Sequence, residues 1–243
     1  MEEAGEINLQ LLNSRQRPVK GGYSIGHHQG SAGSIGCLVT PVSGTDDSVY
    51  ILSNSHVLAN SGTCTKGDPV LQPGPSDYGT INDKIADLDR WARFRYSNPS
   101  NLVYTNQVDA AIAGPIDVKN CDPSIAEINV IPRGIAPTID VDDKVVKVGR
   151  TSHKTDGEID AVNVRAKIPY PSGTVAYSDM IICRNQTTGQ AFTEHGDSGS
   201  LVLSENGYAV ALHVAGNSKY SFSCPIQEVL RAMQVSLVTA PIC

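Results

Sequence analysis

The sequence predicts an all-β protein built from many short strands. Apolar runs of four to eight residues, rich in Val and Ile, recur along the 243-residue chain with turn residues close by. Glycine (22 residues) and proline (14 residues) are plentiful, which suits frequent turns. A length of 243 residues fits one large domain or two small ones. These observations favour a sandwich or a barrel of short strands.

A polar lead-in over residues 1–20 precedes the predicted strands. Within it, Leu9, Leu11 and Leu12 are candidates for one short helix. The clearest strands lie at residues 34–40, 49–53, 108–113, 145–149, 161–165, 200–203 and 208–214. Each is short and rich in β-branched residues, as strands of an all-β domain are.

One helix is expected near the end of the chain, over residues 225–236. Pro225 stands in its first turn, where a missing N–H is tolerated, and Ser223 is a candidate cap. Its apolar face would be formed by Ile226, Val229, Leu230 and Met233.

A boundary is expected near residues 122–136, where prolines and a glycine interrupt the strand pattern. It divides the chain into a first unit over 21–128 and a second over 129–243, which also carries the helix. Each unit then has about six strands.

The composition excludes several functional classes. A net charge of −6 offers no basic surface for nucleic acid or an anionic membrane. The N-terminal MEEAGE lacks the basic and apolar parts of a signal peptide, so a cytoplasmic location with six reduced cysteines is expected. No His/Cys spacing indicates a metal site, and no cofactor is expected.

The most informative segment is 194–200, EHGDSGS. A serine next to glycines, as Ser198 is, stands on a tight turn that projects its hydroxyl. The backbone N–H groups of Gly196 and Ser198 would then converge on one point, as a tetrahedral oxyanion requires. The segment therefore predicts a nucleophilic serine with an oxyanion site.

Chain order identifies the base and the acid that such a serine needs. The order serine, acid, histidine of the α/β-hydrolases would need Glu205 and His213, and the 15 residues from Ser198 to His213 cannot hold the intervening elements. In the order histidine, aspartate, serine, His56 follows a predicted strand and Asp109 begins another. His56, Asp109 and Ser198 are therefore the candidate catalytic residues. His195 stands too near Ser198 to be this base and is expected at the rim of the site.

These motifs resemble those of the trypsin-like serine peptidases of the chymotrypsin fold (PA clan), over roughly residues 20–240. The matching segments are SIGCLV (34–39), SNSHVL (53–58), VDAAIA (108–113), KVGRT (147–151) and GDSGS (196–200). The segments SIGH (24–27), LQPGP (71–75) and VGRT (148–151) resemble in particular intracellular peptidases of bacteria and the narrow-leaf-type proteases of plants.

The resemblance implies two six-stranded antiparallel β-barrels with the active site in the cleft between them. It makes His56 the general base, Asp109 its orienting partner and Ser198 the nucleophile. Some positions differ from the digestive trypsins, which have a disulfide cysteine in place of Val57 and glycine in place of Ser200. Because no Arg-Ile-Val-Gly-Gly activation site is present, Asp197 is not expected to pair with a newly formed N-terminus.

The resemblance also locates the pocket for the P1 residue of the substrate, S1. It puts Phe192 at the base, where enzymes that cleave after Arg or Lys carry an acid, so a basic P1 residue is not expected. Thr193 and His213 match pocket residues of glutamyl endopeptidases and could donate hydrogen bonds to a carboxylate. A preference for Glu or Asp at P1 follows, although His213 could also be a packed core residue.

The expected function is that of a serine endopeptidase acting on a protein or peptide. Two alternatives stay open: a protease-fold binding or scaffold protein with little turnover, and a self-processing protease dedicated to one partner. A homo-oligomer or a regulatory partner would restrain such an enzyme inside a cell. Arg150 and Thr151 are expected to shape a turn of the second barrel.

Overall fold

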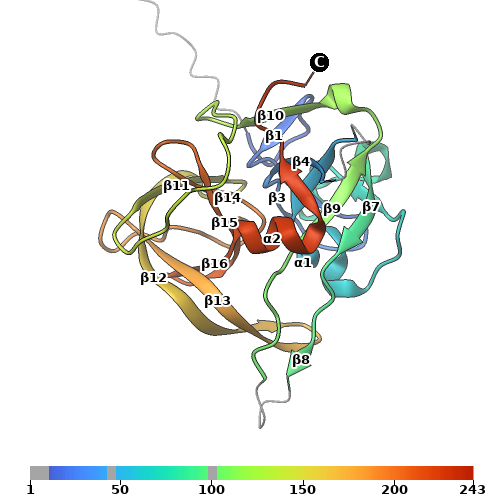
Figure 1. Ribbon diagram of the computed structural model, residues 1–243. Coiled ribbons are helices and arrows are strands. Elements are labelled where there is room, and N and C mark those ends of the chain that lie inside the picture. Colours follow the sequence, from blue (N-terminus) through green and yellow to red (C-terminus); the bar gives the residue numbers. More distant parts are fainter. Residues whose placement is uncertain (1–10, 43–47, 98–102, 243) are drawn as a thin grey trace, which may run out of the picture.

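The computed structural model describes residues 11–42, 48–97 and 103–242. Two groups of strands lie side by side, one from the first half of the chain and one from the second (Figure 1). Each group is a curved antiparallel sheet, as expected for an all-β chain of short strands.

The first sheet has six main strands with a short strand at either edge. In spatial order these are β17 (Val235–Leu237), β4 (Cys37–Pro41), β5 (Tyr50–Ser53), β9 (Ala111–Pro115), β7 (Lys84–Trp91), β6 (Pro69–Leu71), β2 (Ser24–His27) and β3 (Gly33–Ser34). Every pairing in it is antiparallel. The short helix α1 (Ser55–Leu58) follows β5 directly.

The second sheet closes into a ring. Its spatial order is β12 (His153–Tyr170), β11 (Lys144–Gly149), β14 (Leu201–Ser204), β15 (Ala209–Gly216), β16 (Ser221–Pro225), β13 (Gly173–Asn185) and β8 (Tyr96–Ser97). The long strands β12 and β13 also pair with each other, which joins six of these strands into a barrel. The short β8 pairs with β13 at the far end of this hairpin (Figure 1).

Each half of the chain also contributes a strand to the other sheet. Strand β8 precedes residue 128 but belongs to the second sheet, and β17 comes from the C-terminal part but pairs with β4. A parallel pair outside both sheets joins β1 (Val19–Gly21) to β10 (Cys121–Ile125). The division of the chain at residue 128 stays a prediction.

The C-terminal helix α2 spans Ile226–Met233 and buries the four apolar residues predicted for its inner face. Its N-cap is Pro225 rather than Ser223. The expected serine cap is wrong because Ser223 lies within β16, opposite His213 of β15. The Ser223 hydroxyl has no hydrogen-bond partner among the described residues.

The N-terminal segment has no helix between residues 11 and 20, in contrast to the expectation. Leu12 is buried in the main hydrophobic core, and the chain then enters β1. Leu9 lies outside the described residues.

The five described cysteines are free thiols, and Cys243 lies outside the described residues. Burial raises the pKa of Cys37 and of Cys183 to about 12, which keeps both thiols protonated at neutral pH. Among the described segments, no helix has the length and apolar character needed to cross a membrane.

Candidate active site

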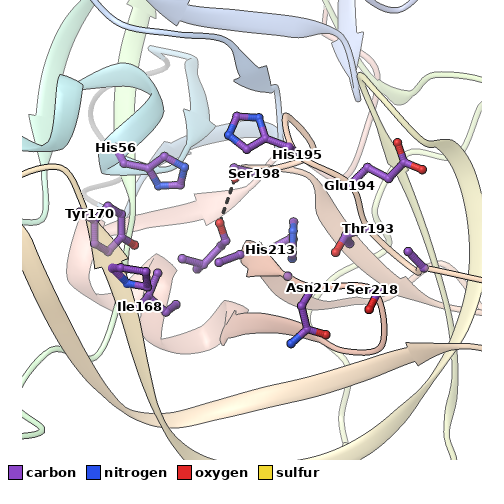
Figure 2. A pocket seen from close by; sticks show the side chains of 15 residues that line it. His56, Ile168, Tyr170, Thr193, Glu194, His195, Ser198, His213, Asn217 and Ser218 are labelled. Carbon is purple, nitrogen blue, oxygen red and sulfur yellow. Dashed lines mark hydrogen bonds between the residues drawn. The ribbon is translucent and has the colours of Figure 1, made fainter.

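A pocket of about 520 Å³ contains the predicted nucleophile and base. Figure 2 shows His56, Ser198 and Tyr170 around one part of it and Thr193 and His213 around another. His56 comes from the first half of the chain, and the other four come from the second. The site therefore lies where the two halves meet.

The antiparallel pairing of β5 with β9 brings His56 and Asp109 together. Ser53 lies opposite Ala111, so that α1 and the residues before β9 are neighbours. The distance from His56 Nδ1 to Asp109 Oδ2 is 2.5 Å, and the backbone N–H of His56 donates to Oδ1 at 3.2 Å. Because the carboxylate accepts from Nδ1, the proton resides there and Nε2 is left as the basic nitrogen.

Tyr170 supplies a further donor to this carboxylate. Its hydroxyl donates to Asp109 Oδ2 at 2.9 Å, and the Tyr177 hydroxyl lies 2.9 Å from the Tyr170 oxygen. The Asp109 side chain is fully buried, and a buried carboxylate needs such donors. Burial and the charge of Asp109 raise the pKa of both tyrosines well above the usual range, so both hydroxyls stay protonated. Since Tyr170 gives its proton to Asp109, Tyr177 donates to Tyr170.

Ser198 stands in a turn that uses glycine on both sides. Gly196 has a φ of +104° and Gly199 a φ of +93°, and a Cβ at Gly199 would lie 2.1 Å from Ser53 Oγ. The Ser198 hydroxyl donates to the carbonyl of Val214 at 2.9 Å, drawn as the dashed line in Figure 2. The described residues show no hydrogen bond between Ser198 and His56. The structure therefore places serine and histidine in one pocket but directs the hydroxyl elsewhere.

The backbone N–H groups of Gly196 and Ser198 donate to no described residue. Their neighbours are paired, since the N–H of Asp197 donates to Glu194 O at 3.0 Å and that of Gly199 to His213 O at 2.9 Å. Two free donors, separated by the single residue Asp197, are therefore available to a ligand oxygen.

A buried ion pair holds the residue next to Ser198. Lys147 Nζ lies 3.0 Å from Asp197 Oδ2, and both side chains are fully buried. The carboxylate also accepts hydrogen bonds from the backbone N–H groups of Thr151, Ser152 and Glu194 at 2.8–3.1 Å. Burial opposes ionisation of Asp197, but Lys147 and these donors outweigh it and lower the pKa to about 2. The partner of Asp197 is thus a lysine within the chain.

Replacing Lys147 with methionine is expected to cost about 3–5 kcal/mol of folding free energy, because the Asp197 carboxylate would remain buried without its counter-charge. Urea unfolding followed by circular dichroism measures this loss. Lys144→Met is the matched control, since Lys144 starts the same strand but is 43% exposed, and it should cost about 1 kcal/mol or less. Equal stabilities of the two variants would contradict the role given to Lys147.

The other part of the pocket holds two polar atoms without partners. His213 and Thr193 are buried, and His213 Nδ1 and Thr193 Oγ1 form no hydrogen bond with any described residue. Burial lowers the pKa of His213 to about 3, so the ring is neutral. Buried polar atoms without partners are costly, and a ligand that bonds to them would remove that cost.

Phe192 precedes Thr193 in the sequence but does not line this pocket. Its ring is buried in a small hydrophobic cluster with Val145 and Ile159, outside the lining of the pocket. A large apolar ring is stabilised by this core rather than by a polar pocket. His195 is exposed and lines the pocket, as expected for a rim residue.

Sequence reasoning missed Tyr170 and Lys147. A lysine inside the apolar run 145–149 is a visible signal, because a buried charge in a strand needs a partner. No local pattern marks Tyr170, whose position depends on the full length of β12.

No family model matches the sequence, and no curated protein matches it. Several solved structures are similar in fold. Thermobifida fusca protease A is 17% identical, with a TM-score of 0.62 over 91% of this chain and 100% of that one. A glutamic-acid-specific serine protease that uses a histidine triad in substrate binding is 19% identical, with a TM-score of 0.60 over 90% and 100%. The chymotrypsin of Cellulomonas bogoriensis is also 19% identical, with a TM-score of 0.61 over 91% and 99%. The chain therefore has the two-barrel fold of the chymotrypsin-like serine proteases.

Proposed function

We propose that this chain is a serine endopeptidase that cleaves proteins or peptides through an acyl-enzyme on Ser198. The observation that carries the proposal is the hydrogen bond from His56 to Asp109, which leaves Nε2 of His56 basic in the pocket of Ser198. The two free N–H groups beside Ser198 support it as an oxyanion site.

The reaction begins when the Ser198 hydroxyl turns from Val214 to His56, a rotation about χ1 between staggered positions. Its oxygen attacks the peptide carbonyl while its proton passes to Nε2 of His56. Asp109, with Tyr170 bonded to it, stabilises the imidazolium, and the free N–H groups bind the oxyanion. His56 then gives its proton to the leaving amine, and water repeats the sequence on the ester.

We further propose that S1 binds an acidic side chain. Thr193 and His213 line the pocket, and their buried atoms Oγ1 and Nδ1 have no partner among the described residues, so both could bond to a carboxylate that displaces their cover. The glutamic-acid-specific neighbour of similar fold supports this choice. Because burial keeps His213 neutral, binding of a carboxylate beside it would raise its pKa and draw in a proton.

This mechanism predicts a pH dependence of specificity. The ratio of kcat/KM for a Glu peptide to that for the matched Gln peptide is expected to fall as pH rises, by up to about tenfold per unit, because the proton on His213 becomes harder to supply. Dividing by the rate for the Gln peptide cancels every pH effect that the two substrates share. Initial rates between pH 5 and 9 measure the ratio, and a ratio constant with pH would contradict proton uptake by His213.

Cleavage of a mixed peptide pool tests the function and its specificity together. We expect cuts mainly after Glu, with fewer after Asp. Cuts mainly after large apolar or basic residues would support the endopeptidase function but contradict the proposed preference for acidic residues. The absence of any cleavage by folded protein would favour the second candidate, a binding protein of this fold, which the bond from Ser198 to Val214 also suits. The five described cysteines are all free thiols, which supports a reducing compartment, and we propose that the enzyme acts in the cytoplasm.

A further inference from the structure

We infer that Asp77, Arg150 and Thr151 form a relay that fixes the orientation of the peptide between His195 and Gly196, and with it one N–H donor of the oxyanion site. The inference rests on the proposed function, because only a reacting carbonyl would use that donor. The three relay residues are positioning residues, since none of them lines the pocket.

The first contact of the relay is made by Thr151. Its hydroxyl donates to the carbonyl oxygen of His195 at 2.8 Å. In a trans peptide the C=O and the following N–H point in opposite directions. A donor that holds the carbonyl of His195 therefore turns the N–H of Gly196 away from Thr151, and this N–H is one of the two free donors beside Ser198.

Arg150 fixes which way the Thr151 hydroxyl points. Arg150 Nη1 donates to Thr151 Oγ1 at 3.0 Å, so the oxygen accepts from the guanidinium and its own proton goes to His195. The two side chains also lie against Gly196. A Cβ at Gly196 would be 2.2 Å from Arg150 Nη1 and 2.6 Å from Thr151 Oγ1, so glycine allows this close approach.

Asp77 holds Arg150 from the other half of the chain. It ends the 3₁₀ helix Pro75–Asp77, which precedes β7 of the first sheet. Arg150 Nε donates to Asp77 Oδ2 at 2.7 Å, and Arg150 Nη2 donates to Oδ1. The side chains of Arg150 and Asp77 are only 15% and 6% exposed. This bidentate pair with the carboxylate fixes the plane of the guanidinium. The ammonium group of a lysine could not form such a pair.

Ser34 of β3 holds the next peptide in the same way. The backbone N–H of Arg150 donates to Ser34 Oγ at 3.0 Å, and this hydroxyl donates to Gly196 O at 3.1 Å. The carbonyls on both sides of the Gly196 Cα are thus held by hydroxyl groups. Asp77 closely follows the segment 71–75, and Arg150 and Thr151 belong to the segment 148–151. Two of the segments that carry the sequence resemblance thus contribute to one hydrogen-bond network.

Thr151→Val tests the relay, because valine keeps the shape of threonine and removes the hydroxyl. Thr151→Ser is the control, because serine keeps the hydroxyl. We expect kcat of Thr151→Val to fall by about 10- to 100-fold, while KM changes less than twofold. This loss in kcat is somewhat smaller than the loss that follows removal of an oxyanion donor itself. The affinity for a peptide aldehyde that adds to Ser198 should fall in parallel. Thr151→Ser should remain within about twofold of the wild type, and Arg150→Lys should lose activity as Thr151→Val does.

Crystal structures of the two Thr151 variants make the test independent of turnover. A His195–Gly196 peptide that has rotated in Thr151→Val and kept its orientation in Thr151→Ser supports the relay, even if the wild type hydrolyses no peptide. An unchanged peptide in Thr151→Val would overturn it. A lower Tm with full kcat in the folded Thr151→Val enzyme would overturn it too, because it would show a merely structural role.

Discussion

Replacing Ser198 with alanine is expected to lower kcat by about six orders of magnitude, the scale seen when the nucleophile of a serine protease is removed. The hydroxyl is the atom that forms the acyl-enzyme, and no other group in the mechanism replaces it. Its only hydrogen bond among the described residues is to the Val214 carbonyl, so its loss should leave the fold intact. Steady-state hydrolysis of a peptide substrate, with unfolding curves for stability, measures both effects.

Ser200→Ala is the matched control. Ser200 lies two residues further along the same turn, and its hydroxyl is buried without a partner among the described residues. Its removal therefore breaks no hydrogen bond, and kcat should stay within a fewfold of the wild type. Comparable activity of Ser198→Ala and the wild type would show that a different group attacks the substrate.

Replacing Asp109 with asparagine is expected to lower kcat by about four orders of magnitude at neutral pH. The buried carboxylate accepts hydrogen bonds through both oxygens, from the backbone and ring of His56 and from Tyr170. An amide has one acceptor oxygen and one NH₂ group, so one of these donors would face another donor. The amide also lacks the charge that stabilises the imidazolium.

The pH profile of kcat/KM in Asp109→Asn separates this role from a loss of fold. Asp142→Asn is the control, because that carboxylate is 76% exposed and its contact with Arg184 is 3.9 Å long. The control should behave as the wild type does. An Asp109→Asn enzyme within tenfold of the wild type at every pH would contradict the assignment of Asp109.

The structural features that the sequence could predict are those with a local pattern. The turn at Ser198 needs glycines at positive φ, and these are visible as letters in the segment 194–200. Strand patterns place His56 after one strand and Asp109 before another, and antiparallel pairing of those strands brings the two residues together. The buried face of α2 follows in the same way from its helical spacing.

The parts that could not be predicted depend on contacts between distant segments. Tyr170 reaches Asp109 only because β12 and β13 form a long hairpin whose tip meets β8 from the other half of the chain. Whether Lys147 faces the core or solvent is a matter of register, and its partner lies 50 residues away. By local preference Ser223 is a candidate helix cap, but the pairing of β16 with β15 determines its conformation.

The direction of the Ser198 hydroxyl makes its activation by His56 the central question. Labelling with a fluorophosphonate, followed by intact-mass and peptide mass spectrometry, answers it most directly, with His56→Ala as control. We predict a single adduct on Ser198 in the wild type and none in the control. Folded wild-type protein without an adduct, or an adduct that forms equally well in His56→Ala, would contradict the account.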